Sequence, residues 1–174
     1  VYYLRHANPV IERLLKNTLI NNVQITAAES AGLEGRAGYF DAVGTFRDMF
    51  QSHLIQIAAL LTMRLMTNPK DMKAARLDAV KKFYLPPAAD LSETIVQGQY
   101  ASGEVSGKKL PAYGEEEGVV RKSRTATFAA MRLMTRSSKW EGVPIFLRSG
   151  KRLKTKETRI AIEFQESATL VGKN

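Results

Sequence analysis

The amino-terminal half of the chain carries apolar residues at steps of three and four, which is the pattern of amphipathic helices. The steps run through residues 2–16, where Pro9 marks either the true start of a helix or a kink within it. They are strongest over residues 42–66, and Asp41 is placed to cap that helix at its N-terminus. A further helix is predicted over residues 69–83.

Apolar and polar residues alternate between and after these helices, as in half-buried strands. Strands are predicted over residues 21–28, 125–134, 145–148 and 158–164, and a further strand ends near Tyr100. Residues 98–118 are rich in glycine and charge and are predicted to form a loop. Helices first and several antiparallel strands later indicate an α+β domain, with a largely antiparallel sheet and helices packed on one face of it.

Length and composition are those of one soluble globular domain. The chain has 174 residues, of which 44% are hydrophobic and 25% charged. It has no cysteine, which excludes disulfides, thiolate metal sites and thiol nucleophiles and fits a reducing compartment such as the cytoplasm. The longest apolar run, residues 54–63, is interrupted by Gln56 and is too short to span a membrane. The chain starts without methionine or a signal-peptide pattern, so we expect it to come from the middle of a longer protein.

The formal net charge of +9 narrows the class of partner. A positive field attracts anions, which include nucleic acid, anionic membrane and phosphorylated small molecules. Aromatic residues make up only 8% of the chain, and no stretch interleaves them with basic residues as in surfaces that stack single strands. Composition alone does not decide which anion is bound.

No cofactor site can be recognised in the sequence. The chain contains neither the GxGxxG fingerprint of dinucleotide-binding folds nor a P-loop. Its glycines at 32, 35, 38 and 44 have a different spacing and no acidic residue at the expected distance downstream. A nucleotide could bind only in some other way.

His53 is the more interesting of two histidines that could act as a general base. It lies in the middle of the predicted helix 42–66 among apolar neighbours, which would desolvate the imidazole and keep it neutral. The alternative is a core histidine that is satisfied by one hydrogen bond. Asp48 lies five residues earlier, about 140° around an α-helix, so the two side chains should point to different sides. Asp48 could accept a hydrogen bond from a polyol, or be an ordinary exposed carboxylate.

Two further positions are candidates for ligand contact. Glu29 ends a predicted strand just before a glycine-rich loop, where carboxylates often contact ligands and as often contact nothing. The densest basic cluster is residues 148–156, in which Gly150 allows a sharp bend that would present Lys151 at a fixed position. Lysine is a mobile donor to phosphate or sugar hydroxyls. A solvated basic loop and a nucleic-acid patch are the alternatives, and the short length of the cluster disfavours the latter.

Taken together and in order, these segments resemble glucose-6-phosphate dehydrogenases. The matching segments are Leu4-Arg-His-Ala-Asn8, Glu29, Glu34-Gly-Arg-Ala-Gly-Tyr-Phe-Asp41, Arg47-Asp48, Gln51-Ser-His53, Gly98-Gln-Tyr100, Thr125-Ala-Thr-Phe-Ala-Ala130 and Trp140-Glu-Gly-Val-Pro-Ile-Phe-Leu-Arg-Ser-Gly-Lys151. Each is weak alone, whereas the ordered set is specific and covers nearly the whole chain.

The resemblance implies a chemistry and roles for five residues. The family oxidises glucose 6-phosphate at C1 to 6-phosphogluconolactone and passes the hydride to NADP or NAD. By resemblance, His53 takes the proton of the C1 hydroxyl, Glu29 and Asp48 contact sugar hydroxyls, and Lys151 binds the substrate. Lys156 falls where the family has a second basic substrate contact, which is arginine in some members.

The resemblance also implies that residues 1–174 form only part of the family's C-terminal domain. In the family, a Rossmann domain precedes this region, as does the Asp-His-Tyr-Leu-Gly-Lys-Glu segment that orients the histidine and grips the 6-phosphate, and more strands and helices follow. We therefore expect the cofactor site to lie elsewhere in the parent, the isolated chain to be inactive, and the parent to form a homodimer or homotetramer through the sheet. No nucleic-acid or membrane partner is expected. The alternative is a non-catalytic assembly module of the same fold.

Overall fold

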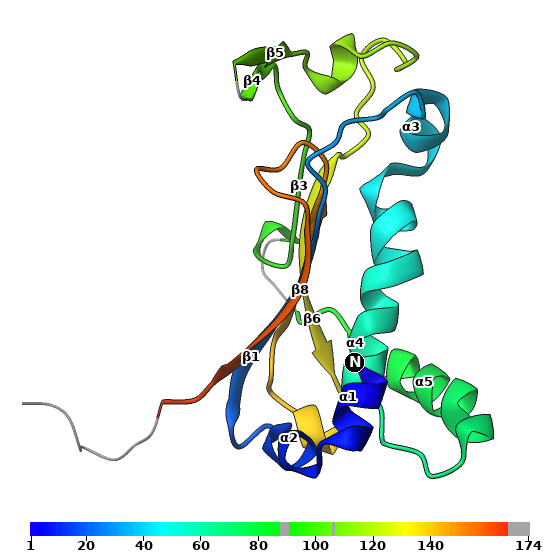
Figure 1. Ribbon diagram of the computed structural model, residues 1–174, viewed down its shortest axis with the longest axis vertical. Coiled ribbons are helices and arrows are strands. Elements are labelled where there is room, and N and C mark those ends of the chain that lie inside the picture. The colour runs from blue at the N-terminus through cyan, green and yellow to red at the C-terminus, as the bar shows by residue number, and fades with distance from the viewer. Residues whose placement is uncertain (88–90, 106, 167–174) are drawn as a thin grey trace, which may run out of the picture.

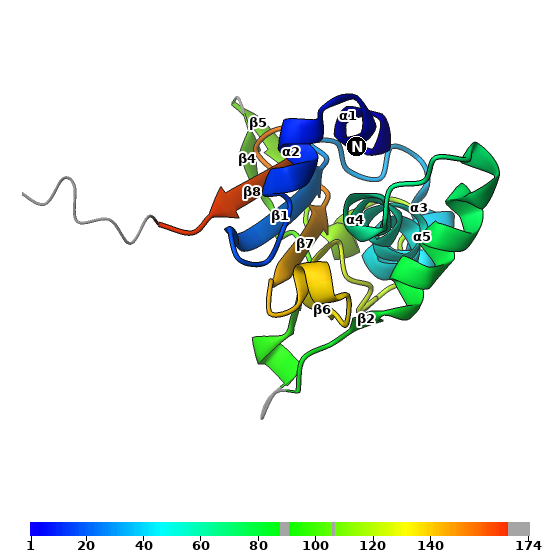
Figure 2. The same cartoon turned by 90° about the horizontal axis from the view of Figure 1, so that it is seen from below.

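The protein is described by a computed structural model that covers residues 1–87, 91–105 and 107–166. Within these residues a six-stranded sheet runs in the order β2-β6-β7-β1-β8, and β3 pairs with β6 beside this path. Helices lie along one face of the sheet (Figures 1 and 2). The strands are β1 Ile20–Ala28, β2 Phe83–Tyr84, β3 Ile95–Gly98, β6 Phe128–Thr135, β7 Ile145–Gly150 and β8 Glu157–Phe164. The predicted α+β class is therefore confirmed.

The helical column along the sheet differs from the single helix predicted over residues 42–66. It comprises α3 Ala37–Thr45, a π-helix η1 Phe46–Leu54 and α4 Ile55–Thr62. Gly44 interrupts it with φ 67° and ψ 169°, a conformation that only glycine adopts readily. The prediction that Asp41 caps this helix is wrong, because Asp41 lies inside α3 and its side chain binds elsewhere.

The remaining helices are close to those predicted. The stretch 2–16 forms α1 Tyr2–Ala7 and α2 Pro9–Leu14, so Pro9 begins a second helix. The stretch 69–83 forms a 3₁₀ turn η2 Pro69–Asp71 and α5 Met72–Lys81. Short 3₁₀ turns also occur at η3 Leu91–Glu93 and η5 Ser138–Trp140. Within the described residues, no helix combines the length and the apolar character that crossing a membrane requires.

Strand alternation builds the main core between the sheet and the helical column. In β6 the buried residues Ala129, Met131 and Leu133 alternate with half-buried ones. Their neighbours on the other strands and on η1 and α4 complete one apolar cluster, which includes Val23, Ile25, Phe50, Leu54, Ala58, Ile145 and Leu147. The opposite face of the sheet carries polar contacts instead. Arg148, for example, donates a hydrogen bond to Gln24 at 3.0 Å.

The neighbouring strands β1 and β7 run parallel within a sheet that is otherwise antiparallel, in agreement with the largely antiparallel sheet that the sequence predicted. Their register pairs Ala27 with Ser149 and Ala28 with Gly150, whereas the other pairs of this sheet are antiparallel. Periodicity shows that a segment is a strand but not which strand it pairs with. The parallel pairing matters for the site because the carboxyl ends of β1 and β7 meet at one edge of the sheet.

Residues 99–105 and 107–127 extend beyond the sheet and form a lobe beside α3, at the top of Figure 1. Within the lobe lie the short strands β4 Gly103–Val105 and β5 Lys108–Leu110 and the turn η4 Tyr113–Glu115. A separate small core joins the lobe to α3, with Leu33, Ala37, Phe40 and Tyr113 buried in it. The lobe is therefore packed against the start of the helical column.

Candidate functional site

Glu29 and Lys151 meet where the two parallel strands end. Each directly follows a residue of the register pair Ala28–Gly150. The Glu29 N–H donates to the Gly150 carbonyl at 2.9 Å, and the Glu29 carbonyl accepts from the Leu153 N–H at 2.9 Å. The Lys151 ammonium forms an ion pair with the Glu29 carboxylate. Strand register therefore brings together two residues that are 122 positions apart.

Lys151 is held in a tight and mostly apolar setting. Its side chain is only 7% exposed, and its ammonium lies 5.1 Å above the ring of Phe40 from α3. Its N–H donates to the Thr127 carbonyl at 2.9 Å. The preceding Gly150 packs so closely against Phe128 that a Cβ there would lie 2.8 Å from the ring. Lys151 therefore follows a closely packed backbone, in which glycine is needed at position 150 for its small size and not for a positive φ.

Asp48 lies on the π-helix, and its side chain faces the same small cavity as Lys151. It is half-buried and lines a small cavity together with Leu33, Arg36, Tyr39, Phe40 and Lys151. A carboxylate and an ammonium from different elements thus face one cavity next to Glu29. The arrangement offers both hydrogen-bond acceptors and donors to a polar ligand.

The expected 140° between Asp48 and His53 is wrong because η1 is a π-helix. In such a helix the hydrogen bonds join residues five apart, so these residues lie one turn above each other. The Ile55 N–H donates to the Phe50 carbonyl in this pattern, and the Ser52 hydroxyl donates to the Arg47 carbonyl at 3.2 Å. Asp48 and His53 therefore share one side of the helix. π-helical turns are rare and frequently occur at functional sites.

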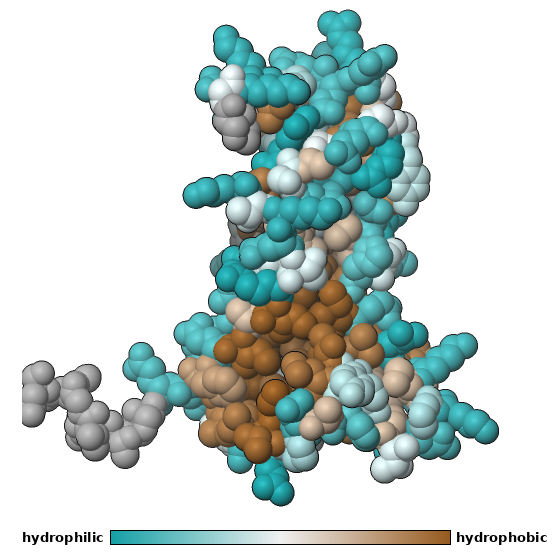
Figure 3. Space-filling model, in the orientation of Figure 1, coloured by the Kyte–Doolittle hydropathy of each residue, from teal (hydrophilic) through white to brown (hydrophobic). Residues whose placement is uncertain are grey.

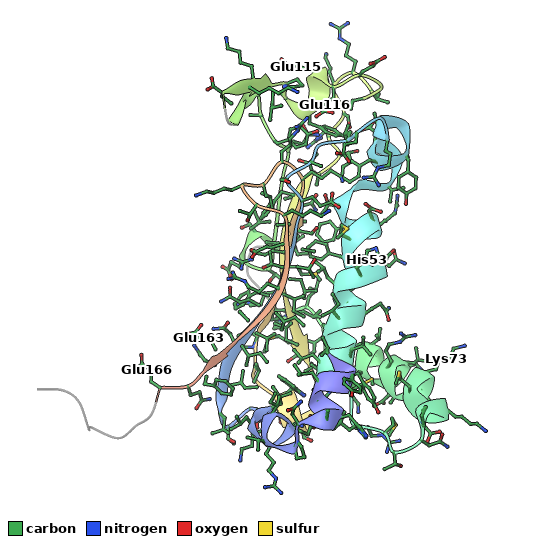
Figure 4. All side chains as sticks on the ribbon, in the orientation of Figure 1. His53, Lys73, Glu115, Glu116, Glu163 and Glu166 are labelled. Carbon is green, nitrogen blue, oxygen red and sulfur yellow. The ribbon has the colours of Figure 1, made fainter. Side chains whose placement is uncertain are left out.

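His53 is exposed, so the expectation that its apolar neighbours would bury it is also wrong. Phe50 and Leu54 turn into the main core, while His53 lies beside that stripe on η1 (Figure 4). It does not line the cavity of Asp48 and Lys151. The imidazole is accessible to a ligand that extends along the helix from that cavity.

Lys156 is exposed in the turn between β7 and β8 and forms no ion pair with the described part of the chain. Its neighbour Glu157 pairs with Ala28 across the sheet, which puts Lys156 at the same edge as Glu29. The basic cluster is not a uniformly solvated loop. Arg148 binds Gln24 on the sheet and Arg152 forms an ion pair with Glu116 at 3.0 Å.

Sequence reasoning missed several polar and aromatic residues that hold the site. The Asp41 carboxylate accepts hydrogen bonds from the Tyr113 hydroxyl at 2.7 Å, from Ser123 and from the Val120 N–H. Burial raises the pKa of Asp41, but these hydrogen bonds outweigh it and lower the pKa below its ordinary value. The block Tyr39-Phe40-Asp41 was a usable signal, although its contact partner lies 72 residues away.

Glu116 of the lobe is held in the same way. It accepts a hydrogen bond from the Tyr100 hydroxyl at 2.6 Å and binds Arg152, and Figure 4 shows it at the base of the lobe. Burial alone would raise the pKa of Glu116, but these two partners outweigh it and lower the pKa. The lobe and the turn after β7 are therefore joined by charge-assisted hydrogen bonds.

The glycine-rich loop after β1 borders a cavity of about 690 Å³. The cavity lining includes the acidic residues Glu34, Glu116 and Glu117 together with Arg152. At Gly32 a Cβ would lie 2.6 Å from the Arg152 guanidinium, whereas the corresponding space at Gly35 and Gly38 is open.

The chain is similar to proteins that share the name glucose-6-phosphate 1-dehydrogenase. The chain is 44% identical over 170 residues to a glucose-6-phosphate 1-dehydrogenase of Dickeya dadantii, covering 95% of the chain and 34% of that protein. It is 38% identical over 165 residues to the Bacillus subtilis enzyme of that name, covering 94% of the chain and 34% of that protein. The chain thus spans about a third of the length of the curated relatives it matches.

Solved structures of glucose-6-phosphate dehydrogenases also align with nearly the whole chain. One is described as a glucose-6-phosphate dehydrogenase in complex with its substrate glucose-6-phosphate. It aligns with a TM-score of 0.84 at 34% identity, covering 97% of this chain and 34% of that one. The glucose-6-phosphate 1-dehydrogenase of Mycobacterium avium aligns with a TM-score of 0.83 at 34% identity, covering 98% and 36%. The family model for the glucose-6-phosphate dehydrogenase C-terminal domain matches residues 2–174, and the chain therefore belongs to the glucose-6-phosphate dehydrogenase family.

Proposed function

We propose that this chain supplies the sugar-binding and proton-accepting part of an enzyme that oxidises glucose 6-phosphate to 6-phosphogluconolactone. The observation that carries the proposal is the convergence of Glu29, Asp48 and Lys151 at one edge of the sheet, beside the π-helix that bears His53. Family membership supports it, as does the related structure described with glucose 6-phosphate bound.

The charges suit a phosphorylated sugar. Glu29 and Asp48 accept hydrogen bonds from sugar hydroxyls, and Lys151 donates to the sugar from its fixed position. Lys156 is free to swing towards the phosphate because it is exposed. The net charge of +9 favours the approach of the dianionic substrate.

In the reaction His53 accepts the proton of the C1 hydroxyl while the hydrogen on C1 leaves as hydride. The C1–O bond becomes the carbonyl of the lactone, so the substrate loses two electrons and two hydrogens. A nicotinamide cofactor, NADP or NAD, bound by the rest of the parent would supply the hydride acceptor. The aspartate that orients His53, the cofactor site and the residues that grip the 6-phosphate belong to the rest of the parent in this proposal.

Assembly through the sheet is part of the proposal. The face of the sheet opposite the helices is uncovered in the described residues and carries polar groups such as Gln24 and Arg148. A homodimer or homotetramer of a cytoplasmic parent would use this face. The isolated chain is inactive in this proposal, because its sequence lacks the GxGxxG fingerprint of a dinucleotide site and the cofactor is held by the rest of the parent.

The test is the variant His53→Ala in the full-length parent. We expect kcat to fall by about 10²–10⁴-fold, the usual contribution of a general base, with little change in the KM for glucose 6-phosphate. Steady-state kinetics with NADP and glucose 6-phosphate measure both. The matched control is His6→Ala, which removes the other exposed histidine, stacked 6.1 Å from Tyr2. Near-normal turnover of His53→Ala would remove His53 from its role as base.

A further inference from the structure

Three aromatic rings connect the lobe to the helix that supports Lys151. Tyr113 is fully buried and meets the rings of Phe40 and Tyr100 edge-on, with centroid distances of 6.3 and 5.7 Å. Such edge-to-face contacts are favourable beyond the area they bury. We call Phe40, Tyr113 and Tyr100 the aromatic bracket.

At its first end the bracket grips two consecutive residues of α3. The ring of Tyr113 packs against Phe40, and its hydroxyl donates to the Asp41 carboxylate at 2.7 Å. Ser123 and the Val120 N–H bind the same carboxylate, and the Thr125 hydroxyl binds the Asp41 carbonyl at 2.7 Å. These contacts fix both the position of α3 and its rotation about its axis. The ring of Phe40 is the surface over which the Lys151 ammonium lies.

At its second end, Tyr100, the bracket is connected to Lys151 through Glu116 and Arg152. The Tyr100 hydroxyl donates to Glu116 at 2.6 Å, and Arg152 donates to the same Glu116 oxygen at 3.0 Å. The Arg152 guanidinium also lies 5.8 Å from the centre of the Tyr100 ring. Because Arg152 directly follows Lys151, the turn after β7 is fixed by the lobe. Two contacts thus restrain Lys151. Its ammonium lies against the ring of Phe40, and its backbone is restrained by the next residue, Arg152, which binds Glu116.

Neither tyrosine lines the cavity that Asp48 and Lys151 share. Tyr113 and Tyr100 can therefore affect a ligand in this cavity only indirectly, through the residues that they contact. Tyr113 is the centre of this arrangement because it contacts both of the other rings and Asp41.

We propose that Tyr113 and Tyr100 are positioning residues for the Lys151 ammonium, so that the lobe sets the affinity of the sugar-phosphate site. The proposal rests on the function proposed above, in which Lys151 binds the substrate. A lysine misplaced by a fraction of an ångström still carries its charge but loses hydrogen-bond geometry to the sugar.

The test compares Tyr113→Phe with Tyr2→Phe in the full-length parent. Tyr113→Phe keeps the ring and removes only the hydroxyl that binds Asp41. Tyr2→Phe also removes a tyrosine hydroxyl with long-range hydrogen bonds, to the Met66 carbonyl at 2.9 Å and from its N–H at 3.1 Å, but on α1, away from the site. We expect Tyr113→Phe to raise the KM for glucose 6-phosphate about tenfold, with kcat within twofold and the KM for NADP unchanged. Tyr2→Phe should change none of these.

The second variant, Tyr100→Phe, keeps the test decisive if Tyr113→Phe does not fold. It removes the hydroxyl that binds Glu116 from a half-buried ring and should also raise the KM for glucose 6-phosphate alone.

Two results would overturn the proposal. One is an unchanged KM for glucose 6-phosphate in the tyrosine variants of the bracket. The other is an equal rise in Tyr2→Phe, which would mean that lost stability alone accounts for the effect. Failure of the proposed function is distinguishable from both, since the unmodified parent would then not oxidise glucose 6-phosphate at all.

Discussion

The buried Lys151 side chain has two neighbours that compensate an ammonium for the lost water. An ammonium removed from solvent needs a counter-charge, or its burial becomes very unfavourable. Glu29 supplies that charge, and the face of Phe40 adds a cation–π contact. Glu29 remains 35% exposed, so the pair opens to the solvent on the side of the carboxylate. A sugar hydroxyl can approach there and share the carboxylate with the lysine.

This pairing predicts the effect of Glu29→Ala on stability. The variant leaves the Lys151 ammonium buried without its partner, and the free energy of unfolding should fall by about 2 kcal/mol. That is less than the loss for a fully buried pair, because water reaches Glu29. Denaturant titration of the chain measures it.

The control for Glu29→Ala is Asp78→Ala, which breaks the exposed pair of Asp78 and Lys82, joined at 2.8 Å one helical turn apart. It should change the free energy of unfolding by about 0.5 kcal/mol or less. Equal losses in the two variants would show that burial adds nothing to the Lys151 pair.

The sequence identified the charged residues of the site but not their surroundings. Glu29 and Lys151 could be found because each follows a strand, and the resemblance singled out both. The exposure of His53 could not be foreseen, since Phe50 and Leu54 on either side of it are buried. The block Tyr39-Phe40-Asp41 marked Asp41 but not its role, because its partner Tyr113 lies in a stretch without periodicity. Contacts between irregular segments leave no repeat in the sequence.

At the scale of elements, the break at Gly44 separates α3 from the π-helix. The chain is fixed there by the lobe, since Thr45 donates from its hydroxyl to the Ala126 carbonyl at 2.7 Å. The apolar repeat runs through α3, η1 and α4 without a change that would reveal the break or the π-helical winding. Helix existence could therefore be predicted, whereas its division into three pieces could not. The same holds for the parallel pairing of β1 and β7, which depends on contacts distant in sequence.

Gly44→Ala should destabilise the protein, because alanine fits poorly at the break between α3 and the π-helix. The alanine would have to adopt a positive φ of 67°, and its Cβ would lie 3.2 Å from the Thr125 methyl group. We expect the free energy of unfolding to fall by about 1–3 kcal/mol, the usual cost of a strained backbone position. The substrate affinity of the full-length parent should fall as well, because Asp48 follows the break on the same helix.

The matched control for the break is Gly38→Ala, within the same helix α3. Gly38 has no positive φ, and apart from its chain neighbours and its own helix backbone no described atom lies within 4 Å of the place that an alanine methyl group would occupy. Alanine there should stabilise the helix by about 0.5–1 kcal/mol, because glycine lowers helix propensity. Thermal and denaturant unfolding of both variants give the two values. Equal effects would contradict the role of Gly44 as a required break.

At the scale of the whole molecule, the candidate site and the main apolar surface lie apart. Figure 3 shows apolar side chains gathered over α1, α2 and the neighbouring part of β8. Exposed apolar residues on and beside these helices include Val1, Leu4, Val10 and Leu14. Contiguous apolar surface of this kind marks places of contact with other protein. The site instead lies where β1 and β7 end near α3, away from that surface.

This separation leads to a prediction for ligand binding by the isolated chain. Glucose 6-phosphate at ten times its dissociation constant should stabilise the chain by about 1.4 kcal/mol, or raise Tm by about 3–6 °C. The variant Lys151→Met should lose most of the shift, and NADP alone should produce none. Differential scanning fluorimetry with glucose 6-phosphate, glucose and inorganic phosphate separates sugar recognition from simple attraction of anions to the net charge of +9. An equal shift with inorganic phosphate would mean that the sugar contacts of Glu29 and Asp48 are not formed without the rest of the parent.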